Sequence, residues 1–185
     1  MSTVQLIEAD QAPLLARAYY ADGDPGPIVG ALAQVPELLT VALPFIGTAL
    51  GPSAIGWRTK EIVIVRTSAL QQCRFCVQTH TVVALDAGLD RDQVAALRDG
   101  RPLDGEGFAD PAERALLRWI DTVALGPGPV DEQARDAMRQ HWADYEIVEL
   151  TAVVAVTLML NRFATALELP TGTDTLARLA AEGLL

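Results

Sequence analysis

The sequence has few of the residues that mark several common classes of protein. It contains only two cysteines in 185 residues, which excludes a small fold held together by several disulfides. Lys and Arg number 14 against 24 Asp and Glu, and the net charge of −10 argues against a nucleic-acid partner, because phosphate binding needs clustered positive charge. Apolar side chains are plentiful instead. Half of the residues are hydrophobic, which is enough to bury a full core and excludes a disordered chain.

Targeting and membrane signals are also missing from the sequence. The start, Met1 to Gln11, has neither the basic stretch nor the apolar stretch of a secretory signal. The longest apolar run, Leu150 to Leu160, is well short of the roughly 20 residues that span a bilayer, and we interpret it as part of a buried core helix. We therefore expect a soluble, cytoplasmic protein with no membrane partner, in a compartment that keeps thiols reduced.

Helix-start signals recur along the chain, whereas β signals are scarce. Asp90 with Gln93 forms a capping box, and Asp110 precedes Pro111 as an N-cap residue before a proline at the first helical position. Apolar residues follow such starts at spacings of three and four. The pattern predicts an all-α fold in one domain over residues 1–185. The predicted helices cover residues 8–20, 36–50, 59–72, 73 onward, 90–100, 110–124, 131–142 and 144–167.

Proline residues set expected limits for two of these helices. Pro44 lies inside the predicted helix 36–50, and we expect it to kink or end that helix. Pro170 follows the last long apolar helix and is expected to stop it. Residues 62–65 are β-branched, but they lie in a longer helical window, and we predict a helix there.

The residues that can carry chemistry gather in one short segment. Both cysteines and one of the two histidines fall within eight residues, as Cys73, Cys76 and His80. In a helix these three positions share one face. Cys73 would lie near the start of that helix, where free N–H groups favour a thiolate, and the pair lies within disulfide reach. His80, one turn after Cys76, is placed to accept a proton from it.

Glu61 joins this group only if the chain reverses direction. Twelve residues of straight helix would carry it about 18 Å from the cysteines. If the chain turns at Gln71 and Gln72, however, two antiparallel helices place Glu61 beside His80. Glu61 would then orient the imidazole or relay its proton in a nucleophile–base–orienter arrangement.

Other interpretations of the cysteine pair stay open at the level of the sequence. The two thiols could be inert core residues, since free cysteine is often buried. They could also form half of a zinc site with His80, with Glu61 or the distant His141 as the fourth ligand. We favour a redox pair, expect no metal and no cofactor, and interpret His141 as a residue at a helix end.

The spacing of these residues resembles that of a known family. Glu61, eleven residues, Cys73, two residues, Cys76, three residues and His80 match the signature of the alkylhydroperoxidase AhpD-like proteins of the carboxymuconolactone decarboxylase superfamily. The resemblance extends over residues 30–168 and includes 36–39, 146–151 and 161–163. It implies a core at about 30–168 with helical extensions at both ends. One position departs from it, because Phe75 stands where the best-known members carry a second histidine.

The resemblance implies a fold, an activity and partners. The fold is an AhpD-like helical orthogonal bundle with the Cys-x-x-Cys at the start of a helix in a hairpin, assembled as a homo-oligomer, either a trimer or a hexamer. The activity is a thiol peroxidase for organic hydroperoxides, with Cys76 as the peroxidatic thiol and Cys73 as the proton donor and resolving thiol. Glu61 and His80 form its proton relay, which Phe75 would make shorter or differently hydrated. An external dithiol, in known members a lipoyl-bearing protein, restores the pair. The alternative is a non-enzymatic helical oligomer that uses the site as a redox sensor or zinc staple.

Overall fold

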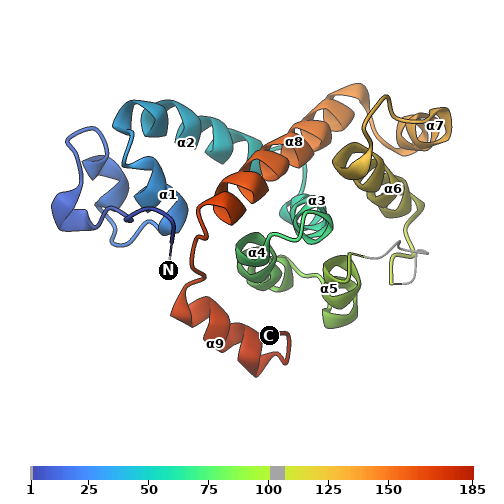
Figure 1. Ribbon diagram of the computed structural model, residues 1–185. Helices are drawn as coiled ribbons and strands as arrows, with labels where there is room; N and C mark the ends of the chain where they lie inside the picture. The colour runs from blue at the N-terminus through green and yellow to red at the C-terminus, as the bar shows by residue number, and fades with distance from the viewer. Residues whose placement is uncertain (1, 101–106) are drawn as a thin grey trace.

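A computed structural model describes residues 2–100 and 107–185, and in these ranges every regular element is a helix (Figure 1). The expectation of an all-α fold is confirmed. Two short 3-10 helices, η1 and η2, lead into the α-helices. The elements are η1 (Ala9–Gln11), η2 (Arg17–Tyr20), α1 (Pro27–Leu32), α2 (Pro36–Leu50), α3 (Trp57–Leu70), α4 (Arg74–Asp86), α5 (Arg91–Arg98), α6 (Pro111–Leu125), α7 (Glu132–His141), α8 (Asp144–Ala166) and α9 (Thr173–Ala181).

Helix α3 lies at the centre of the molecule. It packs against α4, α5, α6 and α8, and Figure 1 shows it nearly end-on among them. All residues from Lys60 to Ala69 are buried, so no face of α3 is left to solvent along that stretch. The β-branched residues 62–65 are helical as predicted. Burial on every side outweighs their modest preference for strands, because propensity is a weak term beside tertiary packing.

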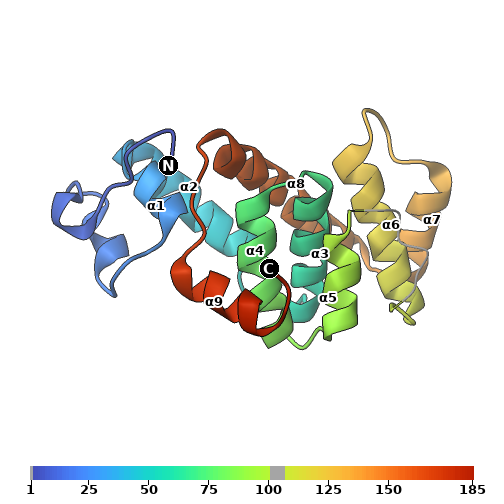
Figure 2. The same ribbon diagram turned by 60° about the horizontal axis from the view of Figure 1, so that its bottom comes forward.

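Helix α8 crosses the molecule above α3 and α4, with α2 beside one half of it and α6 near the other (Figures 1 and 2). It has 23 residues and a mean hydropathy of 1.7, and is thus long and apolar enough to cross a membrane by length and composition alone. It is longer than the uninterrupted run from Leu150 to Leu160 because polar and charged residues flank that run inside the same helix. In the structure α8 is a core helix that contacts several other helices. These include α2, α3, α4, α6 and α7.

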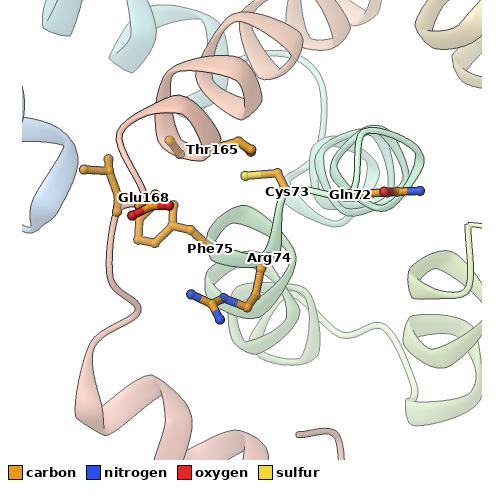
Figure 3. A pocket seen from close by; sticks show the side chains of 8 residues that line it. Gln72, Cys73, Arg74, Phe75, Thr165 and Glu168 are labelled. Atoms are coloured by element: carbon orange, nitrogen blue, oxygen red, sulfur yellow. The ribbon is translucent and has the colours of Figure 1, made fainter. Parts of the chain in front are cut away.

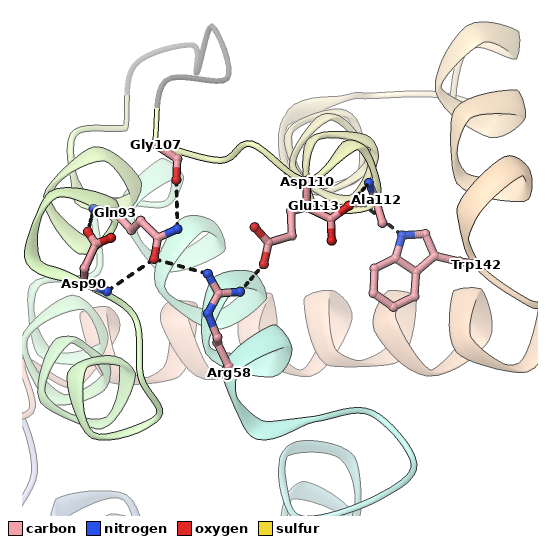
Figure 4. A network of polar contacts seen from close by, with 8 residues as sticks. All are labelled: Arg58, Asp90, Gln93, Gly107, Asp110, Ala112, Glu113 and Trp142. Atoms are coloured by element: carbon pink, nitrogen blue, oxygen red, sulfur yellow. Dashed lines mark hydrogen bonds and ion pairs between the residues drawn. The ribbon is translucent and has the colours of Figure 1, made fainter.

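Polar contacts tie the start of α3 to α5 and α6 (Figure 4). The Arg58 guanidinium pairs with the Glu113 carboxylate of α6 and donates to Gln93 Oε1 of α5 at 3.2 Å. Gln93 also completes the predicted capping box, since its backbone N–H donates to Asp90 Oδ1 at 2.8 Å. Asp110 caps α6 as expected, by accepting from the Ala112 N–H at 2.9 Å. The capping residue Gln93, predicted from the sequence, thus also takes part in the contacts among α3, α5 and α6.

The predicted helix over residues 8–20 was wrong. The structure has two short 3-10 helices there, with residues 12–16 between them. Ala12, directly before Pro13, has an extended backbone (φ −61°, ψ 121°). A residue before proline is disfavoured in the helical region, because the proline ring clashes with its backbone. The apolar spacing that suggested a helix was real, but Pro13 prevents the backbone from following it.

Pro44 was expected to kink or end its helix, and the structure shows that it does not end it. Helix α2 continues through Pro44 to Leu50. Pro44 is exposed, so the Thr40 carbonyl that loses its usual partner faces the solvent side of α2, where water can satisfy it. The other predicted ends agree with the structure within a few residues, including the end of α8 before Pro170.

Candidate active site

The chain reverses at the predicted place, between α3 and α4. Gln72 adopts a left-handed backbone conformation (φ 55°), which turns the chain at the end of α3. Its N–H donates to the Ala69 carbonyl at 3.0 Å, and the Cys73 N–H donates to the Ser68 carbonyl at 3.0 Å. These two bonds form a Schellman motif. Cys73 then serves as the N-cap residue of α4, which places it at the positive end of that helix.

Cys73 and Cys76 are buried free thiols in direct contact. The Cys76 thiol donates to the Cys73 sulfur with an Sγ–Sγ distance of 2.7 Å, and the Cys76 backbone N–H donates to the same sulfur at 3.4 Å. The thiol hydrogen bond from Cys76, aided by this backbone N–H, lowers the pKa of Cys73 to about 6 although burial opposes it. The same hydrogen bond, together with burial, raises the pKa of Cys76. In the reduced pair the thiolate therefore rests on Cys73 and the proton on Cys76.

Two side chains of α8 complete the surroundings of the sulfurs. Hydrogen bonds from Thr165 and Asn161 further lower the pKa of Cys73. Asn161 is buried, and its Nδ2 donates to Ser68 Oγ at 3.0 Å, which ties α8 to the end of α3. No role at the site was predicted for Asn161 or Thr165 from the sequence. A polar amide inside a nearly all-apolar helix was the available signal for Asn161.

Glu61 and His80 meet across the hairpin. Glu61 Oε2 lies 3.0 Å from His80 Nδ1, so the geometric expectation from the position of the turn is confirmed. The Glu61 side chain is only 2% exposed and that of His80 is 25% exposed. A buried carboxylate at Nδ1 favours the tautomer with a proton on that nitrogen, which leaves Nε2 as the ring nitrogen that can bond another group. The carboxylate thus fixes the orientation of the imidazole one helical turn after Cys76.

A cavity of about 500 Å³ opens beside this pair, and we call it the His80 pocket. It lies between the second half of α2, the loop 51–56, the start of α3 and the middle of α4. Most of its lining is apolar. The lining residues are Ile46, Gly47, Leu50, Gly51, Pro52, Ser53, Ile55, Gly56, Trp57, Glu61, Ile64, His80 and Val83.

A second cavity of about 460 Å³, the Cys73 pocket, lies where the start of α4 meets the end of α8 (Figure 3). Its lining residues are Gln72, Cys73, Arg74, Phe75, Ala164, Thr165, Glu168 and Leu169. Figure 3 shows Cys73 directed toward Thr165, with Phe75 directed toward Glu168. Phe75, at the position of the second histidine in the resembling family, therefore faces this pocket and is not among the residues that line the His80 pocket.

The remaining candidate ligands do not join the cysteines. His141 is the last residue of α7, as expected of a helix-end residue. Among residues 2–100 and 107–185, no three His, Cys, Asp or Glu side chains lie close enough together to hold a metal ion. The zinc site that the sequence left open has no such donor set in this part of the chain.

These observations define a class of protein. An all-helical chain whose Cys-x-x-Cys begins one helix of a hairpin, with a glutamate meeting a histidine across that hairpin, has the features of an AhpD-like protein. The sequence model of the carboxymuconolactone decarboxylase family matches residues 36–122, which include Glu61, both cysteines and His80. Over this segment, which holds the whole candidate site, the chain is similar to the carboxymuconolactone decarboxylase family.

Individual proteins resemble the chain more distantly. The uncharacterized protein YdfG of Bacillus subtilis is 26% identical over 116 residues, which are 62% of this chain and 77% of YdfG. An uncharacterized peroxidase-related protein of Ralstonia eutropha, described as an alkylhydroperoxidase AhpD core, has the same fold with a TM-score of 0.81, 19% identity and 94% of each chain covered. The debrominase Bmp8, solved with 2,3,4-tribromopyrrole, has a TM-score of 0.79 at 18% identity, with 98% of this chain and 97% of Bmp8 covered. At such low identities the two solved structures show a shared fold.

Proposed function

We propose that the protein is a thiol-dependent peroxidase that reduces organic hydroperoxides through a dithiol–disulfide cycle of Cys73 and Cys76. One observation carries the proposal. Two free thiols share a hydrogen bond of 2.7 Å at a helix start, one turn from a histidine held by a buried glutamate at 3.0 Å. A thiolate, a proton acceptor and a proton donor for a leaving oxygen are what reduction of an O–O bond requires.

The first half of the cycle consumes the peroxide. The Cys76 sulfur attacks the terminal peroxide oxygen, and the Cys73 thiolate, 2.7 Å away, takes the proton of Cys76. The O–O bond breaks, and His80, oriented by Glu61, relays a proton from solvent to the departing alkoxide. The products are an alcohol and a sulfenic acid on Cys76. Two electrons have passed from sulfur to the peroxide.

The second half of the cycle restores the thiols. Cys73 attacks the Cys76 sulfenic acid, an S–S bond forms, and water leaves with the Cys73 proton. An external dithiol then reduces this disulfide by thiol exchange. Cys73 is the sulfur that lines a pocket, so we propose that the incoming thiol forms its mixed disulfide with Cys73. A lipoyl-bearing protein is the reductant that the family resemblance suggests.

The roles of the two cysteines can be separated by trapping. In Cys73→Ser, tert-butyl hydroperoxide is expected to leave a sulfenic acid on Cys76 that dimedone captures, because no thiol is present to resolve it. In Cys76→Ser, turnover with a panel of dithiols, including dihydrolipoamide, is expected to vanish. Unchanged turnover in Cys76→Ser would refute the assignment. A dimedone adduct found on Cys73 alone would reverse the two roles.

Reductive dehalogenation by the same cysteine pair is a second candidate. The largely apolar His80 pocket, at about 500 Å³, is large enough for a small halogenated ring, and Bmp8 shares the fold. Bromide release from 2,3,4-tribromopyrrole in the presence of a dithiol tests it. A non-enzymatic redox sensor would instead oxidise once, stoichiometrically, and turn over with no donor in the panel.

We also propose that the protein is a homo-oligomer, either a trimer or a hexamer, whose contacts include one apolar face. Helices α2 and α8 pack against each other, and both expose large apolar side chains. We call this surface the α2–α8 face. Its residues are Leu38, Val41, Phe45, Tyr145, Val148 and Met159. In soluble proteins, large apolar surface left exposed marks interaction sites.

A further inference from the structure

The His80 pocket has a distinct chemical character. Its volume of about 500 Å³ lies within the range of sites that bind small molecules. No lysine or arginine lines it, and the apolar residues come from three separate helices and one loop. An apolar ligand would gain free energy by leaving water for such a surface, at roughly 25 cal/mol for each Å² buried.

The Ser53 and Glu61 side chains in the lining are already bonded, whereas His80 keeps one ring nitrogen without a bond to the described protein. The Ser53 hydroxyl bonds the Glu149 carboxylate and accepts from the Ile55 N–H at 2.9 Å. Glu61 is bonded to His80 Nδ1. Among the described residues no protein atom hydrogen-bonds His80 Nε2, which leaves this nitrogen for a polar group of the ligand. An anion would find no cation besides the histidine and would lie near the Glu61 carboxylate, which disfavours it.

Gly47 leaves part of this pocket open. It lies inside α2, where glycine costs about 1 kcal/mol relative to alanine. A Cβ atom added at Gly47 would meet no atom within 4 Å. Gly47 is exposed and lines the pocket, so a larger side chain at this position would extend into open space at the pocket mouth without disturbing the packing of α2. The absence of a side chain here keeps the room that a ligand needs.

We propose that the His80 pocket binds the organic group of a neutral, apolar hydroperoxide about the size of one aromatic ring, with its peroxide oxygens at His80. We further propose that Gly47 sets the size limit of that group. The inference rests on the proposed peroxidase function for the peroxide itself. The apolar ligand site, however, can be tested without turnover.

The binding test uses 2-phenyl-2-propanol, the alcohol formed from cumene hydroperoxide, because it cannot be reduced further. Isothermal titration calorimetry with the reduced wild-type protein is expected to show saturable binding at one site per chain. Gly47→Leu is expected to weaken binding about tenfold or more, since filling a pocket by a few methyl-sized groups costs on the order of 1–3 kcal/mol. Gly172→Leu is the matched control, because a Cβ added at this exposed glycine also meets no atom within 4 Å and Gly172 lines neither pocket; it is expected to bind within about twofold of wild type.

A charged analogue of the same shape tests neutrality. The anion 2-methyl-2-phenylpropanoate is expected to bind about tenfold or more weakly than the alcohol at pH 8, because it must lose hydration without gaining a cationic partner. Equal binding of the alcohol and the anion, or equal binding by wild type and Gly47→Leu, would overturn the inference. Circular dichroism and thermal unfolding of both variants confirm that the fold is retained.

Measurements of turnover distinguish a wrong assignment of the His80 pocket from a wrong assignment of the peroxidase activity. Gly47→Leu is expected to raise the KM for cumene hydroperoxide about tenfold more than the KM for the smaller tert-butyl hydroperoxide. If wild type reduces cumene hydroperoxide and Gly47→Leu does so equally well, the pocket assignment fails and the peroxidase stands. If the alcohol binds as expected but no hydroperoxide is reduced with any dithiol, the peroxidase fails and the apolar ligand site stands.

Discussion

Cys73 and Cys76 are both buried, yet their surroundings push their pKa values in opposite directions. Cys73 accepts hydrogen bonds at a helix start, whereas Cys76 donates its only proton to Cys73. The lowered pKa of Cys73 also links the pair to folding. Unfolding the reduced protein between about pH 6 and pH 9 requires this sulfur to take up a proton, so stability should rise with pH in that window.

The titration of Cys73 is a direct prediction at the residue scale. Thiolate absorbance at 240 nm in the reduced protein is expected to show a step centred near pH 6, with thiolate present above that pH and thiol below it. Cys76→Ala removes the strongest donor to Cys73, so the step should move to higher pH. Cys73→Ala should abolish the step near pH 6. A wild-type step near the ordinary value of 9.0 would contradict the hydrogen-bonded thiolate.

Two residues in left-handed backbone conformations lie beside the same sulfur. Gln72 (φ 55°) and Glu168 (φ 52°) both line the Cys73 pocket. This conformation costs an ordinary side chain about 1–2 kcal/mol, because its Cβ approaches the backbone, whereas glycine avoids the cost. The packing of α3, α4 and α8 thus holds these two residues of the pocket lining in a backbone conformation that they would otherwise disfavour.

Replacement by glycine tests that cost. Gln72→Gly is expected to raise the free energy of unfolding by about 1 kcal/mol, measured by urea denaturation of the reduced protein. Glu168→Gly should change it in the same direction. Gln71→Gly is the control, since Gln71 has an ordinary backbone conformation (φ −87°) and should lose stability. A loss of stability in Gln72→Gly as large as in Gln71→Gly would contradict the interpretation.

At the scale of the helices, Lys60 holds together the end of α2 and the loop that follows it. Its buried ammonium donates to the carbonyls of Ala49 at 3.0 Å and Gly51 at 2.7 Å and lies 2.8 Å from the Glu149 carboxylate of α8. The single lysine of the chain thus caps α2 and fixes the loop 51–56, which forms one wall of the His80 pocket.

Removal of this charge should be costly. Lys60→Met is expected to lower the free energy of unfolding by about 3 kcal/mol, because the Glu149 carboxylate and two carbonyls lose a buried partner. Arg178→Met is the control, since Arg178 forms ion pairs on the exposed surface, and its unfolding midpoint should stay close to wild type. Similar urea midpoints for both variants would show that the Lys60 contacts contribute little.

The features that could be predicted from the sequence are those that depend on residues close to one another along the chain. Capping residues such as Asp90 and Asp110 located helix starts, and the turn at Gln72 was enough to place Glu61 beside His80. Contacts between distant segments were not predictable in this way. The His80 pocket requires α2 to lie near α4, and the role of Asn161 requires α8 to cross the start of α4.

At the scale of the whole molecule, the α2–α8 face accounts for part of the high apolar content of the sequence. Val41 is 71% exposed, Phe45 57% and Val148 70%, on two helices whose other faces pack in the core. A solitary chain would leave this surface in water, at a free-energy cost that association removes. The core alone therefore does not explain a composition that is half hydrophobic.

Charge placed on this face should dissociate the assembly. Wild type is expected to elute as a trimer or hexamer in size-exclusion chromatography with light scattering. Val41→Glu combined with Phe45→Glu should shift it to monomer, since burying a carboxylate without a partner is unfavourable. Leu14→Glu is the control, because Leu14 is equally exposed (78%) but lies in the N-terminal segment. A monomeric wild type, or a double variant with unchanged mass, would contradict the proposed interface.

The two pockets of the site share no lining residue, and this separation has a kinetic consequence. Only the Cys73 pocket is lined by a sulfur, whereas the proposed hydroperoxide site lies at His80. Oxidant and reductant would thus bind at different places, so neither has to wait for the product of the other to depart. Initial rates should follow parallel lines in double-reciprocal plots. The alcohol product should compete with hydroperoxide but not with the dithiol, as in a two-site ping-pong enzyme. A dithiol attached to a bulky carrier protein would then bind without changing the affinity for the peroxide.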